Sequence, residues 1–489
     1  MNDFKSCLEK TGEIGYITSL LGSVAYVSGL PNLKLEEMVI TESGKRGIVH
    51  GLKKKSAEVL MIDVKGLRVE ENVVRTGKSF QIPVGEGLLG RIINPISQPT
   101  DGLGPIRGEK EYQKIKKEAP PLIERRKVKE FLESGVMILD FLVPVGYGQR
   151  ELVIGDAKTG KTTFLLQTIV SQAKKGVICV YVGIGKRDIA VKWVEEYLKK
   201  QKVFDRTIVV HTTPDDPPTL TYLAPFSAMS ITEYFRDKGK KVIIILDDLT
   251  THAKIYREIS LLLKRVPGRD SYPGEIFHIH ASLLERAGNI KNETGKETSI
   301  TALPVAETLE NDLSGYIQTN LMAITDGHIF FDINEFRKGK RPGINAFLSV
   351  SRVGNQTKNS AERELSSWIR KKLVEYQRLS EIAQFGAELP TETQRTIDFG
   401  KRLEFLFNQE SEITIPQNLQ LLLVGLLISG FWENKSLREM KKNVDKLLES
   451  YEKRILPDFE EKIKKIKDFN HLQFLIKELI PEIERKIKD

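Results

Sequence analysis

Cysteine and long apolar runs are both scarce in this chain of 489 residues. It has two cysteines, Cys7 and Cys179, which argues against a disulfide scaffold and fits a reducing compartment, with a reactive thiol pair as the alternative. No apolar run reaches the ~18 residues that a membrane helix needs. The first residues resemble neither a signal peptide nor an Arg-rich transit segment. We therefore expect the protein to work where it is made, or where partners hold it at a membrane.

Acidic residues are also fewer than basic ones. The 75 Lys and Arg exceed the 66 Asp and Glu, which gives a formal net charge of +9. A basic balance favours nucleic acid or anionic lipid as a partner. The lysines, however, are spread along the chain and mixed with glutamates. We interpret them as a solvated lysine-rich surface and predict no nucleic acid partner.

The pattern of the sequence changes twice, which predicts three domains. Residues 1–77 alternate short β-rich runs with turn residues, as in a small closed β-barrel. Residues 78–360 alternate apolar strands with helical patterns, which predicts a parallel α/β sheet. Residues 361–489 have the spacing of a helical bundle, with breaks expected at Pro457 and Pro481.

Individual elements can be placed within the second and third domains. The predicted strands of the α/β domain are 151–155, 177–183, 207–211, 242–247 and 321–326. The predicted helices of the third domain are 363–375, 391–407, 419–431 and 435–454, followed by a Lys/Glu-rich pair.

The strongest local signal is a glycine-rich loop between an apolar strand and a helix. The pattern G-x-x-x-x-G-K-[ST] is formed by Gly155, Asp156, Ala157, Lys158, Thr159, Gly160, Lys161 and Thr162, followed by Thr163. Its backbone N–H groups and the helix N-terminus are suited to phosphate oxygens. Lys161 is predicted to neutralise the β and γ phosphates, and Thr162 to bind Mg²⁺. The alternative is a tight turn without a ligand.

A second signal is the apolar run 242–246, which ends in Asp247 and Asp248. A carboxylate at the C-terminal edge of a parallel sheet lies where such sheets bind their ligands. Asp247 is therefore a predicted Mg²⁺ ligand. For Asp248 we favour the simpler interpretation, a cap on the helix that follows.

Segments along most of the chain resemble the alpha subunits of rotary F-type ATP synthases. The matches are collinear, dense in the middle and thinner at both flanks. They include residues 87–94, 144–155, 222–225, 233–237, 283–287, 301–304 and 349–354. The resemblance implies a β-barrel, a RecA-like P-loop domain and a C-terminal α-helical domain, with ATP or ADP and Mg²⁺ as ligands.

Lys186 stands where the resemblance separates alpha from catalytic beta subunits. Beta-type chains have a Gly-Glu-Arg sequence after this strand, and its Glu activates the attacking water. Here residues 183–188 read Gly-Ile-Gly-Lys-Arg-Asp, and a charged lysine cannot accept a proton at neutral pH. The resemblance thus implies ATP binding without efficient hydrolysis, unless Asp188 serves as the base. Alpha subunits usually have Gln here, so Lys186 departs from both patterns.

Arg352, in a Ser-Val-Ser-Arg sequence, matches the arginine finger of the family. By resemblance it acts in trans, on the catalytic site of the neighbouring beta subunit, where such fingers contribute ~10³–10⁵ in rate. The local alternative is a structural ion pair. Phe336, Arg341 and Pro342 match residues that pack against adenine, and Gln409 matches a contact from the helical domain.

Three positions depart from the family around the nucleotide. The family usually has Arg and Gln where this chain has Ala157 and Lys158, and a second Gln where it has Ser411. The phosphate cradle remains, but the affinity for nucleotide stays open.

The resemblance also implies an assembly. Three alpha subunits would alternate with three beta subunits around a central-stalk gamma subunit, with stator delta and b subunits, and would couple H⁺ or Na⁺ flow to ATP synthesis. The expected place is the cytoplasmic face of a bacterial inner membrane, or an organelle inner membrane, with only indirect membrane contact.

Rival classes stay open. A homohexameric export-type ATPase would keep the Glu that Lys186 replaces. An RNA-translocating hexameric helicase would need an aromatic face on its barrel. The non-catalytic subunit of an archaeal- or vacuole-type ATPase shares the class but usually lacks an intact P-loop.

Overall fold

The computed structural model describes residues 2–292, 295–383, 390–453 and 468–488, together with 462 and 466. Contacts within the chain divide it into two compact units. The first unit comprises Met1–Lys127, Gly176–Thr308 and Asp312–Thr325, and the second comprises Val128–Lys175, Leu309–Asn311 and Asp326–Asp489. The boundaries of these units do not coincide with those of the three domains predicted from the sequence, which stay a prediction.

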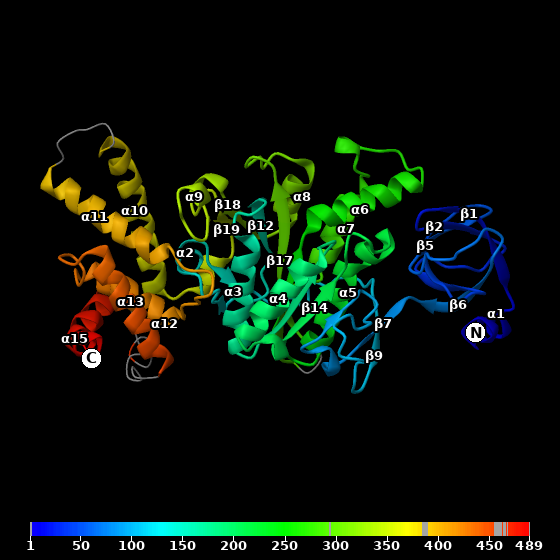
Figure 1. The fold of residues 1–489 in the computed structure, drawn as a ribbon, viewed down its shortest axis with the longest axis horizontal. Coiled ribbons are helices and arrows are strands. Elements are labelled where there is room, and N and C mark those ends of the chain that lie inside the picture. Colours follow the sequence, from blue (N-terminus) through cyan, green and yellow to red (C-terminus); the bar gives the residue numbers. More distant parts are fainter. Residues whose placement is uncertain are drawn as a thin grey trace. The chain divides into compact units, whose positions relative to one another are not determined.

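The first unit begins with helix α1 (Asn2–Thr11) and a closed six-stranded barrel, drawn in blue in Figure 1. Its strand order is β1-β2-β5-β4-β3-β6, with β1 (Ile14–Leu21), β2 (Val24–Ser28), β3 (Glu37–Thr41), β4 (Arg46–Leu52), β5 (Ala57–Met61) and β6 (Asn72–Ser79). β-Branched residues such as Ile17, Val39 and Val59 are buried inside it. Closure pairs the strand edges, which would otherwise invite association with other chains. The predicted barrel is confirmed.

The rest of the first unit is a parallel sheet with helices. The strand order is β17-β15-β13-β14-β8, and β16 pairs with β17 in antiparallel fashion. The strands are β8 (Ile92–Ile93), β13 (Ile178–Gly183), β14 (Thr207–His211), β15 (Val242–Asp247), β16 (Gly288–Lys291) and β17 (Glu297–Thr308), and β7 (Gln81–Val84) forms a ribbon with β9 (Glu111–Lys114). The helices are α4 (Asp188–Lys200), α5 (Pro218–Asp237), α6 (Leu249–Leu262), α7 (Glu275–Leu284) and α8 (Tyr316–Ile324).

One prediction failed in this unit, and one strand was not predicted. The predicted strand 321–326 is wrong, because Leu321 lies in α8 with Ile317 buried one turn before it, and the strand begins only at Gly327. A short apolar run cannot by itself distinguish the two structures. Strand β17 was missed. Pro304 in its interior is a signal against a central strand, although Leu246 of β15 pairs with it.

The second unit carries a smaller sheet. β12 (Glu151–Asp156) pairs in parallel with β18 (Gly327–Phe331), and β19 (Val350–Ser351) pairs with β18 in antiparallel fashion. Around it lie α2 (Met137–Leu142), α3 (Lys161–Lys174), α9 (Ile333–Arg337) and the two-stranded β10 (Phe131–Leu132) and β11 (Val145–Gly146). Helix α3 buries Phe164, Leu165, Ile169 and Val170, the apolar set predicted from its spacing.

Helices complete the second unit: α10 (Ser360–Ala383), α11 (Thr391–Phe407), α12 (Gln417–Ile428), α13 (Leu437–Glu452) and α15 (Phe469–Lys488). Helix α12 is apolar from Leu421 to Ile428 and buried over Leu419–Leu427, as expected of a core helix. The break predicted at Pro481 is wrong, because α15 continues through it. Pro481 and Lys477, whose carbonyl loses its partner, both lie on the exposed face, so water can satisfy that group. The break predicted at Pro457 lies outside the described residues.

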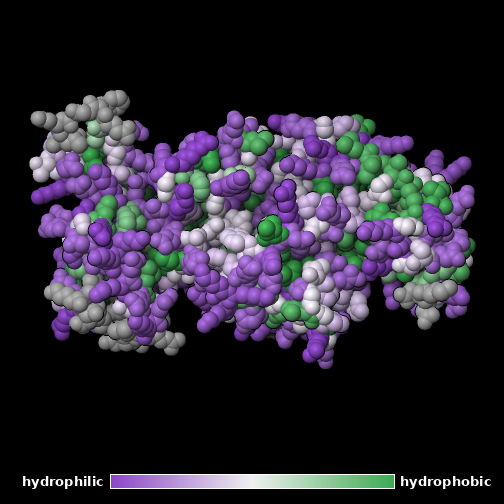
Figure 2. Space-filling model, viewed as in Figure 1, coloured by the Kyte–Doolittle hydropathy of each residue, from purple (hydrophilic) through white to green (hydrophobic). Residues whose placement is uncertain are grey.

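Hydropathy differs between parts of the surface. On the face shown in Figure 2, hydrophilic residues predominate, and hydrophobic residues gather over the barrel. The barrel exposes Ile14, Tyr16 and Leu35 by 47%, 49% and 57%. Among the described helices, none combines the length and the apolar character that crossing a membrane requires.

Candidate functional site

The predicted P-loop connects the buried strand β12 to helix α3. Lys161 Nζ donates hydrogen bonds to the carbonyls of Gly155 (2.8 Å) and Asp156 (2.7 Å). The Thr159 hydroxyl donates to the same Asp156 carbonyl over 2.7 Å. These bonds wrap the loop around the lysine ammonium. Ala157 and Lys158, which depart from the family, are both exposed.

The loop is suited to an anion at the start of α3. Gly160 is the N-cap of this 14-residue helix and no side chain caps it. A Cβ built on Gly160 would meet nothing within 4 Å, so the space beside the helix start is open. The amide groups and dipole of a helix N-terminus attract phosphate. The P-loop therefore fits the phosphates of a nucleotide, with Lys161 beside them and Thr162 and Thr163 half-buried in the first turn of α3.

Sequence reasoning missed the residues that hold the loop in place. The Asn311 N–H donates to both oxygens of Asp156, at 3.0 and 3.2 Å. The Asn311 side chain donates to Asp332 (2.8 Å), and Asn345 donates to the other oxygen of Asp332 (3.0 Å). Hydrogen bonds with these amides lower the pKa of Asp332, although burial opposes them. One signal existed: Asp332 ends an apolar strand, as Asp247 does.

The predicted adenine-binding residues lie together beyond β18. The Arg341 guanidinium lies 3.6 Å from the centre of the Phe336 ring, and its Nη1 donates to the Phe336 carbonyl over 2.7 Å. The Gln409 N–H donates to the Arg341 carbonyl over 2.7 Å. The structure thus brings Phe336, Arg341 and Gln409 into one cluster, and Pro342 follows directly in the chain.

Gln409 has a structural role that the sequence did not reveal. Its side-chain amide donates to the carbonyls of Gly135 (2.7 Å) and Ile413 (2.6 Å), and its oxygen accepts from the Met137 N–H (3.2 Å). The residue is 6% exposed. Its polar atoms are therefore already used, and an adenine contact through them stays a prediction.

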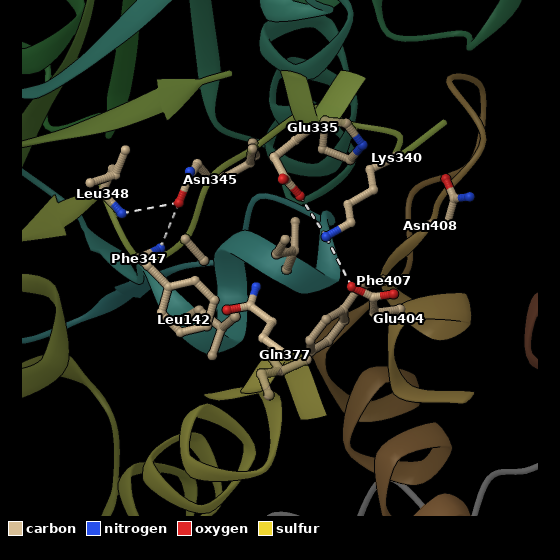
Figure 3. A pocket seen from close by; sticks show the side chains of 15 residues that line it. Leu142, Glu335, Lys340, Asn345, Phe347, Leu348, Gln377, Glu404, Phe407 and Asn408 are labelled. Atoms are coloured by element: carbon tan, nitrogen blue, oxygen red, sulfur yellow. Dashed lines mark hydrogen bonds and ion pairs between the residues drawn. The ribbon is translucent and has the colours of Figure 1, made fainter. Parts of the chain in front are cut away.

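A cavity of about 270 Å³ adjoins this cluster, at the small end of ligand-binding pockets. Figure 3 shows apolar side chains such as Leu142, Phe347 and Phe407 in its wall, and Pro342 also lines it. Lys340 forms ion pairs with Glu335 (2.5 Å) and Glu404 (2.9 Å) beside it.

Asp247, at the end of β15 in the first unit, is paired with Lys186. The Lys186 Nζ lies 2.9 Å from Oδ1 of Asp247, and the Tyr181 hydroxyl donates to Oδ2 over 2.7 Å. Burial disfavours the charged lysine, but the carboxylates of Asp247 and Asp248 outweigh it and raise the pKa of Lys186. Lys186 is therefore a protonated lysine in an ion pair, and a protonated ammonium cannot accept a proton.

The two neighbouring acids have separate roles. Asp248 is the N-cap of α6 and accepts from the Thr250 N–H (2.6 Å), which confirms the predicted cap. Asp188 starts α4 with its side chain 87% exposed. Its Oδ1 lies 3.8 Å from Nε2 of His211.

The residues present do not fit Mg²⁺ at Asp247. Both oxygens of Asp247 have partners, and one of these partners is a cation. Over the part of the chain that the structure describes, no cluster of three His, Cys, Asp or Glu side chains could hold a metal.

Arg352 follows β19 and is exposed. Its N–H donates to the Asp326 carbonyl (3.1 Å), just before β18 begins. Ser349 and Ser351 anchor this segment: the Ser349 hydroxyl donates to the Asn345 carbonyl (2.7 Å) and the Ser351 hydroxyl to the Pro144 carbonyl (2.6 Å). The P-loop follows the other end of the paired strands, so five residues of strand, about 16 Å, separate Arg352 from it.

Comparison with known proteins decides the family. Residues 135–351 match the model of the ATP synthase alpha/beta family, nucleotide-binding domain, and residues 356–483 match that of the ATP synthase alpha/beta chain, C terminal domain. The ATP synthase subunit alpha of Dictyoglomus turgidum is 42% identical over 440 residues, 90% of this chain and 86% of the relative. This chain belongs to the ATP synthase alpha/beta family, among the alpha subunits.

Further relatives extend the match to nearly the whole chain. The ATP synthase subunit alpha of Aquifex aeolicus is 38% identical over 485 residues, 98% of this chain and 93% of the relative. That of Ligilactobacillus salivarius is 41% identical over 420 residues, which cover 86% of this chain and 83% of the relative. The family's nucleotide-binding domain includes the P-loop, Lys186 and Asp247, and Arg352 lies one residue beyond its last matched position.

Proposed function

We propose that this chain is the non-catalytic, ATP-binding alpha subunit of an F-type ATP synthase. The observation that carries the proposal is the ion pair of Lys186 with Asp247, at the place where catalytic members have a glutamate. A lysine held by a carboxylate cannot take a proton from the attacking water. The P-loop retains the lysine and the open helix start that phosphates require.

The position of Arg352 supports its action in trans. It is exposed and lies at the opposite end of the β12–β18 strand pair from the P-loop of its own chain. The length of strand between them is about 16 Å. A guanidinium side chain is too short to cover that distance. We therefore propose that Arg352 stabilises the γ-phosphoryl group bound by a neighbouring catalytic subunit, as arginine fingers do.

The proposed assembly is an alternating hexamer with beta subunits, around a gamma subunit and held by delta and b subunits. The hydrophobic residues exposed on the barrel, such as Ile14, Tyr16 and Leu35, support a protein partner there. We propose that the chain is held at the inner membrane, facing the cytoplasm in bacteria, through the other subunits, and that the complex couples H⁺ or Na⁺ flow to ATP synthesis.

The test uses the purified full chain. Calorimetry measures ATP binding, a coupled assay measures phosphate release, and light scattering measures the mass. We expect a chain that binds ATP without turnover. Lys161→Ala should weaken binding by at least about tenfold, because a charge-assisted bond to phosphate is lost. Lys174→Ala, which removes an exposed lysine at the other end of α3, is the matched control. Turnover by a homohexamer would contradict the proposal, and so would equal binding by both variants.

A further inference from the structure

The residue before Arg352 is tied by a buried glutamine to the segment that leads into strand β12. Gln149 is fully buried, and its side-chain amide donates to the Ser351 hydroxyl over 3.0 Å. The same hydroxyl donates to the Pro144 carbonyl over 2.6 Å and accepts from the Gly354 N–H over 3.2 Å. All of these residues belong to the second unit. Three bonds thus meet on one side chain of the two-residue strand β19.

The amide of Gln149 is itself held by other partners. Its oxygen accepts from the Gly146 N–H over 2.9 Å, and its nitrogen also donates to Oε2 of the buried Glu151 over 2.7 Å. Burial raises the pKa of Glu151 well above its ordinary value, while the hydrogen bond from Gln149 and the charge of Arg352 oppose that rise. The charge of Arg352 therefore acts on the same buried network that holds Ser351.

A second connection anchors the backbone of Arg352, but it lies nearer to water. The Arg352 N–H donates to the Asp326 carbonyl over 3.1 Å, and the Asp326 carboxylate forms an ion pair with Arg150 at 2.8 Å. The side chains of Arg150 and Asp326 are 24% and 23% exposed, so water weakens this pair. Hydrogen bonds in the interior, such as those of Gln149, are electrostatically stronger than hydrogen bonds in water. The buried connection is therefore the one expected to fix the segment that carries Arg352.

We propose that Gln149 is a positioning residue for Arg352, because through the Ser351 hydroxyl it fixes the backbone from which the arginine reaches a neighbouring catalytic site. The inference rests on the proposed function, since it presupposes that Arg352 acts in trans. A displacement of about 1 Å in a catalytic group can cost about 10²-fold in rate. Loss of the Gln149 amide should therefore slow the reaction in the neighbouring subunit.

The test measures the steady-state ATPase reaction of the complex assembled with its catalytic subunits. Gln149→Met keeps the length of the side chain and removes its polar atoms, so it should lower kcat at least about fivefold. KM should stay within about twofold, because a finger interacts with the transition state more than with bound ATP. The matched control is Tyr147→Phe, which removes another buried hydrogen bond of the same segment, from the Tyr147 hydroxyl to Gln172. It should change kcat by less than about twofold.

A double-mutant cycle separates positioning from a general structural defect. In the background of Arg352→Ala, Gln149→Met should lower kcat no further, because no guanidinium is left to position. A merely structural role would lower kcat by the same factor in both backgrounds. Ser351→Ala removes the same connection at a half-buried position and should also lower kcat at least about fivefold. That variant decides the question if Gln149→Met does not assemble.

The outcomes distinguish the inference from the function on which it rests. Equal factors in the two backgrounds, or a loss of kcat below about fivefold in either assembled variant, would overturn the positioning role while leaving the finger intact. An unchanged rate in Arg352→Ala would instead overturn the proposed action in trans, and the inference with it.

Discussion

Breaking the ion pair between Glu233 and Arg286 should strongly destabilise the first unit. Arg286 donates to Glu233 through Nε (2.9 Å) and Nη2 (2.8 Å), and the side chains are 1% and 2% exposed. Glu233→Ala leaves the buried guanidinium with only neutral partners, the Ile115 carbonyl (2.8 Å) and the Ser230 hydroxyl (2.9 Å). Removing one partner of a buried pair costs about 3–5 kcal/mol.

The cost can be measured as hydrogen exchange of the backbone amides in α5, which carries Glu233. A loss of about 3–5 kcal/mol corresponds to exchange that is about 10²- to 10⁴-fold faster, if opening and closing are fast. Replacing both partners, Glu233→Leu with Arg286→Met, should cost much less than Glu233→Ala, because no buried charge is then left alone.

Glu195→Ala provides the control, because its partner Lys199 is half exposed and the pair lies on the surface of α4. We expect that variant to change exchange by at most about fivefold. The reasoning is refuted if Glu233→Ala accelerates exchange in α5 no more than Glu195→Ala does, or if the double variant is the less stable one.

Three other predictions concern the P-loop, Arg352 and the buried His252 of α6. Gly155→Ala places a Cβ 2.2 Å from the Phe331 carbonyl oxygen. It should therefore weaken ATP binding at least about tenfold, measured by calorimetry, and destabilise the chain by about 1–3 kcal/mol. The control is Gly176→Ala, also at positive φ but with open space around it, which should leave the ATP affinity unchanged. Arg352→Lys should lower the ATPase rate of the assembled complex about 10³-fold, and equal rates would exclude a finger. Burial lowers the pKa of His252 from 6.5 to about 4, so the unfolded chain binds more protons between these values. Unfolding free energy should therefore fall as pH drops from 6.5 towards 4, and a profile equally steep in His252→Asn would contradict this.

Local patterns in the sequence were sufficient for most of the fold. The barrel, the P-loop between strand and helix, and strands such as 207–211 and 242–247 follow from spacing and turn residues, because these signals depend on neighbours along the chain. The same reasoning failed for 321–326, because a short apolar run fits a helix and a strand equally. It also failed at Pro481, because water can bond the carbonyl of Lys477 that loses its helical partner.

The residue types at the site were also determined by the sequence: a phosphate-binding loop, a lysine in place of the catalytic glutamate, and a candidate finger. Only the tertiary structure decided which of them meet. The tertiary structure pairs Lys186 with Asp247, 61 positions later in the sequence, and joins Glu233 to Arg286. It also places Arg352 at the end of the β12–β18 strand pair that lies away from the P-loop. Such contacts depend on the order and register of strands that are distant in the chain, and no periodicity within one segment contains that information.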